Sequence, residues 1–268
     1  MESGLSAQLQ TSDAPAISVV IPVFNEADNV EALSHEINSV LSPRGPFEIV
    51  LVDDGSEDET WEFLQRLARQ APSLRPVRHT SRCGQSAALR TGVDAAKHEL
   101  IVTLDGDGQN DPRDIPKLLD VIDADRHALT SLLIIGHRVR RQDSPAKRLA
   151  SRVANAVRSR VLGDATPDTG CGLKVFSRST FLQLPYFDHM HRFLPALIRR
   201  AGGRVISVPI SHRPRQGGQS KYGIFDRLGA GIVDLLGVAW LMRRCPPDYH
   251  LIAESTKSTI NQEPAKRG

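Results

Sequence analysis

Two aspartates separated by one glycine, Asp105 and Asp107, directly follow an apolar run that is typical of a buried strand. Both carboxylates can turn towards one point across the glycine, and Gln109 adds a neutral oxygen nearby. Hard divalent cations such as Mg²⁺ and Mn²⁺ take oxygen ligands and keep room for substrate phosphates. The pattern therefore predicts a metal site, although aspartate and glycine are also the usual residues of a solvated turn.

A second acidic pair, Asp53 and Asp54, closes another apolar run. A carboxylate in that place can accept hydrogen bonds from a nucleobase N–H or from ribose hydroxyls. The alternative is a turn that caps the following helix, with Ser56 and Asp58 as capping residues. No GxGxxG follows the first apolar run and no Walker A motif occurs, which argues against an NAD dehydrogenase and a P-loop NTPase.

Basic residues are concentrated in one part of the chain. The segment 138–160 holds eight Arg or Lys residues and one aspartate, whereas the net charge of all 268 residues is only +3. Such a segment attracts anions, or it is simply a solvated helix face. It would also attract a nucleic acid. The acids at the strand ends and the absence of a nucleic-acid motif favour a small anionic partner instead.

The composition is that of an ordinary globular protein, with 40% apolar and 24% charged residues. Three cysteines lie far apart in no CxxC pair, so we expect neither a disulfide scaffold nor a structural zinc site, and we expect reduced thiols. The first fifteen residues are polar and do not resemble a signal peptide.

Apolar runs alternate with segments of helical spacing over about 200 residues. This alternation predicts an α/β fold of three layers around a mainly parallel sheet, in which ligands bind at the carboxyl ends of the strands. Both acidic pairs fall at such ends. The expected strands are 16–23, 47–54, 75–79, 100–105, 131–138, 173–177 and 204–210, and the expected helices are 25–41, 59–71, 84–96, 112–122, 146–162 and 193–200.

Three motifs in order along the chain resemble those of the family 2 glycosyltransferases: SVVIPVFNE (18–26), VDDGSED (52–58) and TLDGDGQNDP (103–112). Later motifs are similar to the polyprenyl-phosphate branch, typified by dolichol-phosphate mannosyltransferase. These are GHR (136–138), KRLASRVAN (147–155), DTGCGLKVF (168–176), HRFLPAL (191–197) and HRPRQGGQSKYG (212–223). The resemblance covers residues 16–244 and implies a GT-A fold, Rossmann-like, with a C-terminal amphipathic or interfacial helix.

The resemblance also implies a donor site for a nucleotide sugar of the GDP-mannose or UDP-glucose type. The residues that it assigns to donor binding are Pro22, Phe24, Glu26, Asp53, Asp54, Gln85 and Asp105. It assigns a divalent metal, Mg²⁺ or Mn²⁺, to Asp105, Asp107 and Gln109. The metal would bridge the diphosphate and neutralise charge on the departing nucleoside diphosphate.

For the acceptor, the resemblance implies a polyprenyl phosphate held by Arg138, Lys147, Arg148 and Ser151. A phosphate monoester is largely dianionic at neutral pH and needs little help from a general base. The Lys–Arg order at 147–148 leaves open which side chain contacts the phosphate. The residues expected in catalysis are Asp107, Asp168, Arg213 and Lys221, the last two within a basic, glycine-rich lid loop, and Asp168 could equally belong to a turn.

The C-terminal apolar segment 228–242 spans about 22 Å as a helix and is too short to cross a bilayer. It either lies on the membrane surface or packs on protein. We therefore expect a flexible N-terminus (1–15), the glycosyltransferase domain (16–210), the lid loop with the interfacial helix (211–244) and a flexible tail (245–268). The expected location is the cytoplasmic face of a membrane, as a peripheral protein, with room for a separate membrane-protein partner.

Together these expectations describe a metal-dependent hexosyltransferase that makes a lipid-linked monosaccharide. The first alternative is a related enzyme acting on a sugar hydroxyl of a glycolipid or glycan, for which Asp168 is the nearest candidate base. A second alternative, a non-catalytic membrane-binding module, predicts altered metal ligands, whereas Asp105, Asp107 and Gln109 are all present.

Overall fold

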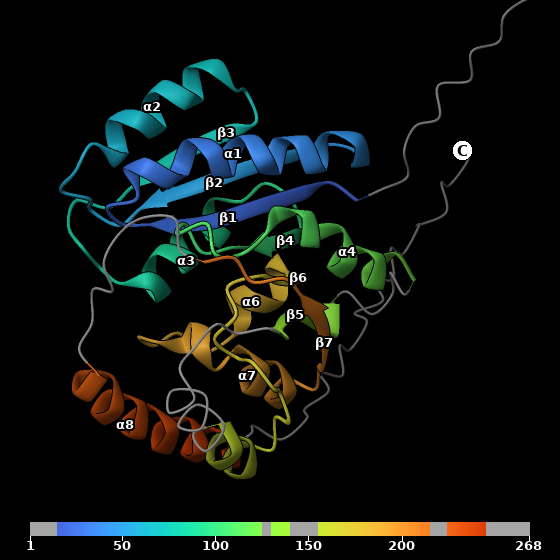
Figure 1. The fold of residues 1–268 in the computed structure, drawn as a ribbon. Coiled ribbons are helices and arrows are strands. Elements are labelled where there is room, and N and C mark those ends of the chain that lie inside the picture. The colour runs from blue at the N-terminus through green and yellow to red at the C-terminus, as the bar shows by residue number, and fades with distance from the viewer. Residues whose placement is uncertain (1–14, 125–129, 140–154, 215–223, 245–268) are drawn as a thin grey trace, which may run out of the picture.

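The computed structural model describes residues 15–124, 130–139, 155–214 and 224–244, with side chains from 231 onwards in the last range. Within these residues seven strands form one sheet in the order β3-β2-β1-β4-β6-β5-β7 (Figure 1). The strands are β1 (Ile17–Val23), β2 (Phe47–Asp53), β3 (Leu74–Arg78), β4 (Leu100–Thr103), β5 (Leu132–Arg138), β6 (Lys174–Ser177) and β7 (Arg204–Ile210).

The sheet is mainly parallel, as the sequence predicts. Only β6 runs against its neighbours, because it pairs antiparallel with both β4 and β5. The remaining pairs are parallel. The carboxyl ends of β1, β2, β4 and β5 therefore meet at one edge of the sheet, and Val23 at the end of β1 pairs with Asp53 at the end of β2.

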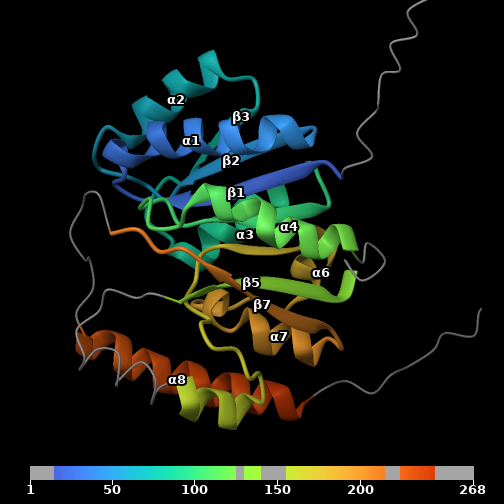
Figure 2. The same ribbon diagram turned by 45° about the vertical axis from the view of Figure 1, so that its right-hand side comes forward.

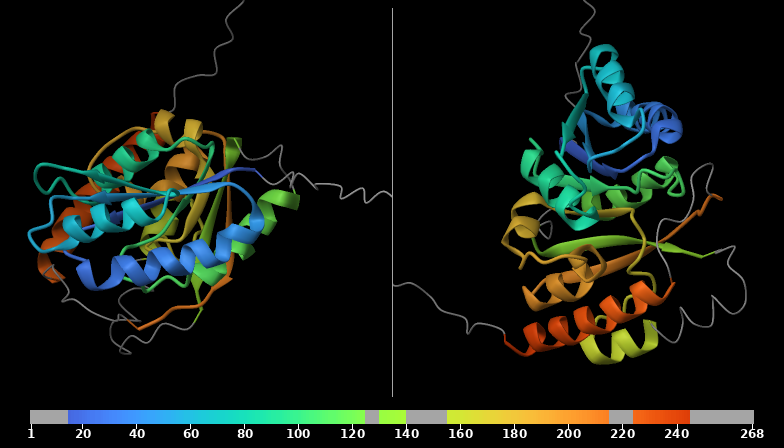
Figure 3. Two further views of the ribbon diagram at one scale, coloured as in Figure 1. Left: turned by 90° about the horizontal axis from the view of Figure 1, so that it is seen from above. Right: turned by 90° about the vertical axis from the view of Figure 1, so that its left-hand side faces the viewer.

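Helices cover both faces of the sheet, so the fold has the three layers that the sequence predicts (Figures 1 and 3). Alternating side chains explain this arrangement: Val19 and Ile21 of β1 belong to one core cluster and Val20 between them belongs to the other. One face carries α1 (Ala27–Leu41), α2 (Thr60–Gln70) and α4 (Ile115–Ala124). The other carries α3 (Gln85–Ala95), α6 (Arg178–Gln183) and α7 (Leu194–Arg200), and short 3-10 turns precede α4 and α7.

The last helix, α8 (Ile224–Arg243), lies beside a short helix over residues 155–162 at the end of the molecule away from α1 and α2 (Figure 2). Apolar packing and two polar contacts attach α8 to the body. Val238 is buried in the second core cluster, Asp234 Oδ2 lies 2.9 Å from His189 Nδ1, and Arg200 Nε donates to the carbonyl of Leu241. No helix among the described residues is long and apolar enough to cross a membrane.

A candidate active site at the carboxyl edge of the sheet

The first acidic pair begins with Asp53, which is fully buried at the end of β2. Its Oδ1 accepts a hydrogen bond from the backbone N–H of Ser56 at 2.9 Å, and its Oδ2 lies 3.1 Å from Arg78 Nε. Gly55 has a φ of +73°, and a Cβ there would lie 2.6 Å from the carbonyl carbon of Ser81. The turn after β2 therefore requires glycine at this position and packs directly on the segment after β3.

Asp54 holds the loop that leads into α3. Its Oδ1 accepts from the backbone N–H of Cys83 and its Oδ2 from that of Gly84, each at 2.8 Å. The same Oδ1 lies 2.8 Å from His79 Nδ1. The loop held in this way carries Arg82, whose guanidinium lies 4.5 Å from the ring centre of Phe24. The structure thus brings Asp53, Asp54 and Phe24 to one edge, next to Pro22 in β1.

Glu26, the remaining donor-site residue of the first motif, is the N-cap residue of α1. Its Oε2 accepts from Asn29 Nδ2 at 2.7 Å, and its backbone N–H donates to Thr60 Oγ1. These bonds tie the end of β1 to the start of α2. Glu26 therefore has a structural role, whether or not it also contacts a donor.

Asp105 follows β4 and its carboxylate fits against a glycine. A Cβ on Gly172 would lie 2.3 Å from Asp105 Oδ2, so no larger residue leaves room for this carboxylate. Gln85 at the start of α3 donates from Nε2 to Asp105 Oδ1 at 2.9 Å. Burial, and then the charge of Asp107, raise the pKa of Asp105. The predicted donor residue Gln85 and the predicted metal ligand Asp105 are thus in direct contact.

Asp107 and Gln109 form the other side of this loop, where the backbone N–H of Gln109 donates to Asp107 Oδ1 at 3.1 Å. Gly106 packs on the end of β1, because a Cβ there would lie 2.7 Å from Val23 Cγ1. The donor set is therefore two neighbouring carboxylates that repel each other and a side-chain amide. This set fits a hard divalent cation, which would remove the repulsion.

Lys174 is a site residue that the sequence analysis missed. It is buried on β6, donates from Nζ to the carbonyl of Cys171, and its charge lowers the pKa of Asp105. Burial lowers the pKa of Lys174 itself, and the neighbouring acids, which raise it, compensate only in part. A lysine within the apolar strand LKVFS is the signal that could have identified it, since lysine is seldom buried without a partner.

Arg138 and Asp168 form a bidentate ion pair at the end of β5. Arg138 Nε lies 2.6 Å from Asp168 Oδ2, and Nη2 lies 2.8 Å from Oδ1. Burial lowers the pKa of Arg138, but the hydrogen bonds and charge of Asp168 outweigh it and raise the pKa. Gly170 lies close by, since a Cβ there would be 3.5 Å from Arg138 Nη2. The structure thus joins one predicted acceptor residue to one predicted catalytic residue.

Arg213 lies beside the metal loop and contacts acids of the protein itself. Its Nη1 is 2.7 Å from Glu36 Oε2 and its Nη2 is 2.6 Å from Asp111 Oδ1. Its backbone N–H donates to the carbonyl of Gln109. Burial raises the pKa of Asp111, but hydrogen bonds from Arg113 and Arg213 outweigh it and hold that pKa at about 2. Arg213 therefore clamps the 105–111 loop.

Four predicted site residues lie outside the described residues: Lys147, Arg148, Ser151 and Lys221. Of the other basic residues in the 138–160 segment, Arg158 is buried and forms an ion pair with Asp164 at 3.2 Å. It also donates to the carbonyl of Thr166. Arg158 therefore holds the 164–169 turn, whereas Arg160 two residues later is exposed.

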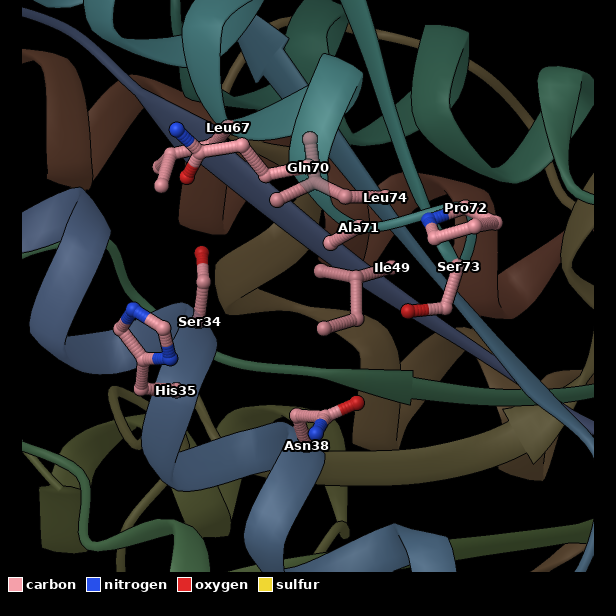
Figure 4. Close-up of a pocket in the computed structure, with 10 residues that line it drawn as sticks. All are labelled: Ser34, His35, Asn38, Ile49, Leu67, Gln70, Ala71, Pro72, Ser73 and Leu74. Atoms are coloured by element: carbon pink, nitrogen blue, oxygen red, sulfur yellow. The ribbon is translucent and has the colours of Figure 1, made fainter.

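A pocket elsewhere in the molecule lies between α1 and α2, near the amino ends of β2 and β3 (Figure 4). Ile49 of β2 and Leu74 of β3 form part of its lining together with His35 of α1. It contains none of the predicted site residues and lies at the opposite end of these strands from Asp53. This pocket is thus separate from the predicted site residues at the carboxyl edge of the sheet.

Comparison with known proteins identifies the family. The model of the glycosyl transferase family 2 matches residues 18–184. Dodecaprenyl-phosphate galacturonate synthase of Rhizobium johnstonii is 37% identical over 232 residues, which are 85% of this chain and 67% of that protein. Undecaprenyl-phosphate 4-deoxy-4-formamido-L-arabinose transferase of Edwardsiella ictaluri is 37% identical over 211 residues, or 78% of this chain and 63% of that protein. The chain thus spans about two thirds of the length of these relatives.

Solved structures give the same fold. Glucosyl-3-phosphoglycerate synthase from Mycobacterium tuberculosis, in complex with Mn²⁺, UDP-glucose and glycerol 3-phosphate, is 20% identical with a TM-score of 0.61, covering 87% of this chain and 82% of that one. Mannosyl-3-phosphoglycerate synthase from Rubrobacter xylanophilus is 16% identical with a TM-score of 0.61, covering 88% and 77%. These likenesses show a GT-A-like fold. The chain therefore belongs to glycosyl transferase family 2, in the branch of the polyprenyl-phosphate sugar transferases.

Proposed function

We propose that this protein transfers a sugar from a nucleotide diphosphate sugar to a polyprenyl phosphate and so makes a lipid-linked monosaccharide. The observation that carries the proposal is the placement of the charged Arg138, oriented by Asp168, at the same edge of the sheet as Asp105. The names of the two relatives, a dodecaprenyl-phosphate galacturonate synthase and an undecaprenyl-phosphate sugar transferase, support the same acceptor.

The donor nucleotide is proposed to bind over the ends of β1 and β2. Phe24 and Arg82 offer an aromatic ring and a guanidinium there, and the fully buried Asp53 holds the turn beside them through Ser56 and Arg78. Asp54 acts mainly by positioning, because its two oxygens hold the backbone of Cys83 and Gly84. The loop that Asp54 holds places Gln85 next to Asp105. The nucleotide part and the metal part of the donor site are therefore connected through this loop.

Asp105, Asp107 and Gln109 are the residues that would hold the divalent cation. When bound, such a cation supplies Lewis-acid stabilisation of the departing nucleoside diphosphate. The protein contributes the positions of these ligands: Gly172 leaves room for the carboxylate of Asp105, and Lys174 partly balances its charge before a donor arrives. Arg213 is proposed to act on the same loop through Asp111, and a catalytic role for Lys221 stays a prediction.

The acceptor phosphate is proposed to bind at Arg138, with Lys147, Arg148 and Ser151 as further candidates. Arginine carries several N–H donors, and since Asp168 engages Nε and Nη2 of Arg138, the phosphate would be bound through the donors of Nη1. Both oxygens of Asp168 face Arg138, which makes Asp168 an orienting group rather than a free base. A phosphate dianion needs no general base, whereas a sugar hydroxyl does. This pair therefore favours the phosphate acceptor over the alternative sugar hydroxyl.

A lipid surface is proposed as the partner of the end of the molecule formed by α8 and the 155–162 helix. Spacing of four residues puts Ile232, Leu236 and Trp240 on one face of α8, and these three are 53 to 65% exposed. Val157 and Val161 are similarly exposed on the neighbouring helix. Arg243 and Arg244 follow Trp240, where cations meet lipid headgroups. The side of the membrane on which this occurs stays a prediction.

The test is transfer of label from a panel of nucleotide sugars to a short-chain polyprenyl phosphate in the presence of Mn²⁺. The panel should contain GDP-mannose and UDP-glucose, as the sequence predicts, and uronic-acid and amino-pentose donors, as the names of the relatives suggest. We expect one donor to give a labelled lipid phosphate sugar. Label that enters only a glycolipid through a sugar hydroxyl would contradict the proposed acceptor.

A further inference from the structure

A second group of metal-ligating side chains lies beside the donor site, and only one of them, Asp54, has a part in the proposed reaction, as a positioning residue. Asp54, His79 and Cys83 each offer one ligand atom, and these atoms all lie within 4.8 Å of one another. They come from the end of β2, the end of β3 and the loop before α3. The set contains a sulfur and a ring nitrogen, whereas the 105–109 loop offers only oxygen ligands.

Hydrogen bonds around the group already hold two of the three ligands. Gly84 N–H donates to Oδ2 of Asp54, and Oδ1, which accepts from the backbone N–H of Cys83, also faces His79 Nδ1. His79 Nε2 lies 2.9 Å from Thr91 Oγ1. Partners of this kind orient the ligands in protein metal sites. The hydroxyl of Thr91 can donate or accept, so it supports His79 with the ring proton on either nitrogen.

Cys83 supplies the third ligand atom from the solvent side. Its side chain is exposed, with Sγ 3.2 Å from the carbonyl of Ser81. A zinc ion bound to sulfur, nitrogen and oxygen keeps these atoms about 3.2 to 3.7 Å apart. The distance of 2.8 Å between Asp54 Oδ1 and His79 Nδ1 would therefore lengthen slightly when an ion binds, and the exposed side chain of Cys83 would turn towards it. Cys83 is the exposed member of the group, whereas Asp54 is buried and His79 is half-buried.

We propose that Asp54, His79 and Cys83 bind a zinc-class divalent cation at a site separate from the hard-cation site of Asp105 and Asp107. Thiolate, imidazole and carboxylate together select zinc over magnesium or manganese. On binding, the thiol of Cys83 loses its proton to solvent, and His79 faces the ion with Nδ1 while Nε2 donates to Thr91 Oγ1. One proton is released for each ion bound, and a bound ion stiffens the loop that carries Gln85 to Asp105.

The test is zinc binding to the full chain without substrates, in excess Mg²⁺ to occupy the oxygen site, by calorimetry in two buffers of different ionisation enthalpy. We expect one equivalent with release of one proton, and Co²⁺ in its place should show a thiolate-to-cobalt absorption band. Cys83→Ser should remove that band and weaken zinc binding about tenfold or more. Zinc binding by Cys83→Ser that equals the wild type would overturn the proposal.

Two further variants separate this site from the rest of the chain. His79→Gln keeps hydrogen-bonding groups in place of the imidazole and should also weaken zinc binding, with circular dichroism to confirm the fold. Asp107→Asn and Cys245→Ser should bind zinc as the wild type does. Loss of zinc binding in Asp107→Asn would assign the ion to the oxygen site and contradict the proposal. Since no donor or acceptor is present, failure here does not bear on the proposed transferase activity.

Discussion

The two sides of the site are built in different ways. On the donor side, at the ends of β1, β2 and β4, the protein's own donors hold each acid: Arg78 contacts Asp53, the 83–84 backbone contacts Asp54, and Gln85 contacts Asp105. On the acceptor side, the described residues offer one oriented cation, Arg138, and exposed apolar side chains on α8. The donor side is rigid and polar, whereas the acceptor side joins a cation to an apolar surface.

This difference matches what each side is proposed to bind. A nucleotide sugar is a small polar molecule, and pre-oriented groups bind it without paying for their own ordering. A polyprenyl phosphate has one anionic end and a long apolar tail that stays in the bilayer. Only the phosphate then needs a polar site, and the apolar surface brings that site to the membrane.

Asp107→Ala should remove metal-dependent turnover. Loss of a ligand to the proposed cation forfeits several kcal/mol of charge stabilisation, so we expect turnover to fall about 1,000-fold or more. Initial rates across a Mn²⁺ titration measure it. The fold should persist, because Asp107 lies in a loop after β4 and not in the core. Wild-type activity in this variant would contradict the proposal that Asp107 holds a divalent cation on the donor side of the site.

Arg138→Ala should weaken the acceptor side alone. Hydrogen bonds to a charged group contribute about 1.5–3 kcal/mol, so the KM for polyprenyl phosphate should rise about 10- to 100-fold with little change in the KM for the donor. Asp168→Asn, which leaves Arg138 in place without its charged partner, should have a smaller effect in the same direction. Arg160→Ala, an exposed neighbour in the basic segment, is the matched control. A rise in the donor KM instead would show that Arg138 serves the nucleotide.

Leu236→Glu combined with Trp240→Glu should reduce membrane binding. Each exposed apolar side chain that enters the bilayer contributes up to about 2 kcal/mol, so co-sedimentation with anionic vesicles should fall about tenfold or more. Activity on a short, water-dispersed acceptor should be retained, because neither residue lies at the strand ends. Tyr186→Ser, an exposed apolar residue on neither helix, controls for general loss of surface apolarity. Equal sedimentation of the double variant would mean that α8 faces protein.

Asp111→Asn should give the smallest effect, in stability. Hydrogen bonds from Arg113 and then Arg213 lower the pKa of Asp111 from its usual 3.8 to about 2, so these bonds to the ionised carboxylate stabilise the fold above pH 4. This stabilisation is lost as the pH falls towards 2, and we expect about 1–2 kcal/mol at neutral pH. Urea unfolding of both proteins at several pH values measures it. A difference that does not shrink on acidification would mean that the charge of Asp111 contributes nothing.

Sequence reasoning located the strands and the acids at their ends, because apolar runs followed by aspartate mark both features. The antiparallel direction of β6 was not predictable, since its pattern LKVFS reads alike in either direction. Nor was the pairing of Asp168 with Arg138, thirty residues apart, which depends on how β5 meets the 164–172 turn. The role of Arg213 as a clamp follows from the position of Glu36 on α1, which no local motif encodes.

The most direct test of the account compares two acceptors of equal chain length in the same vesicles, a polyprenyl phosphate and the corresponding polyprenol. Initial rates are measured with the preferred nucleotide sugar and Mn²⁺. Because the acceptor site is proposed to recognise a phosphate through Arg138 and to lack a free general base, transfer to the phosphate should exceed transfer to the alcohol about 100-fold or more. Equal rates with the two acceptors would contradict the account.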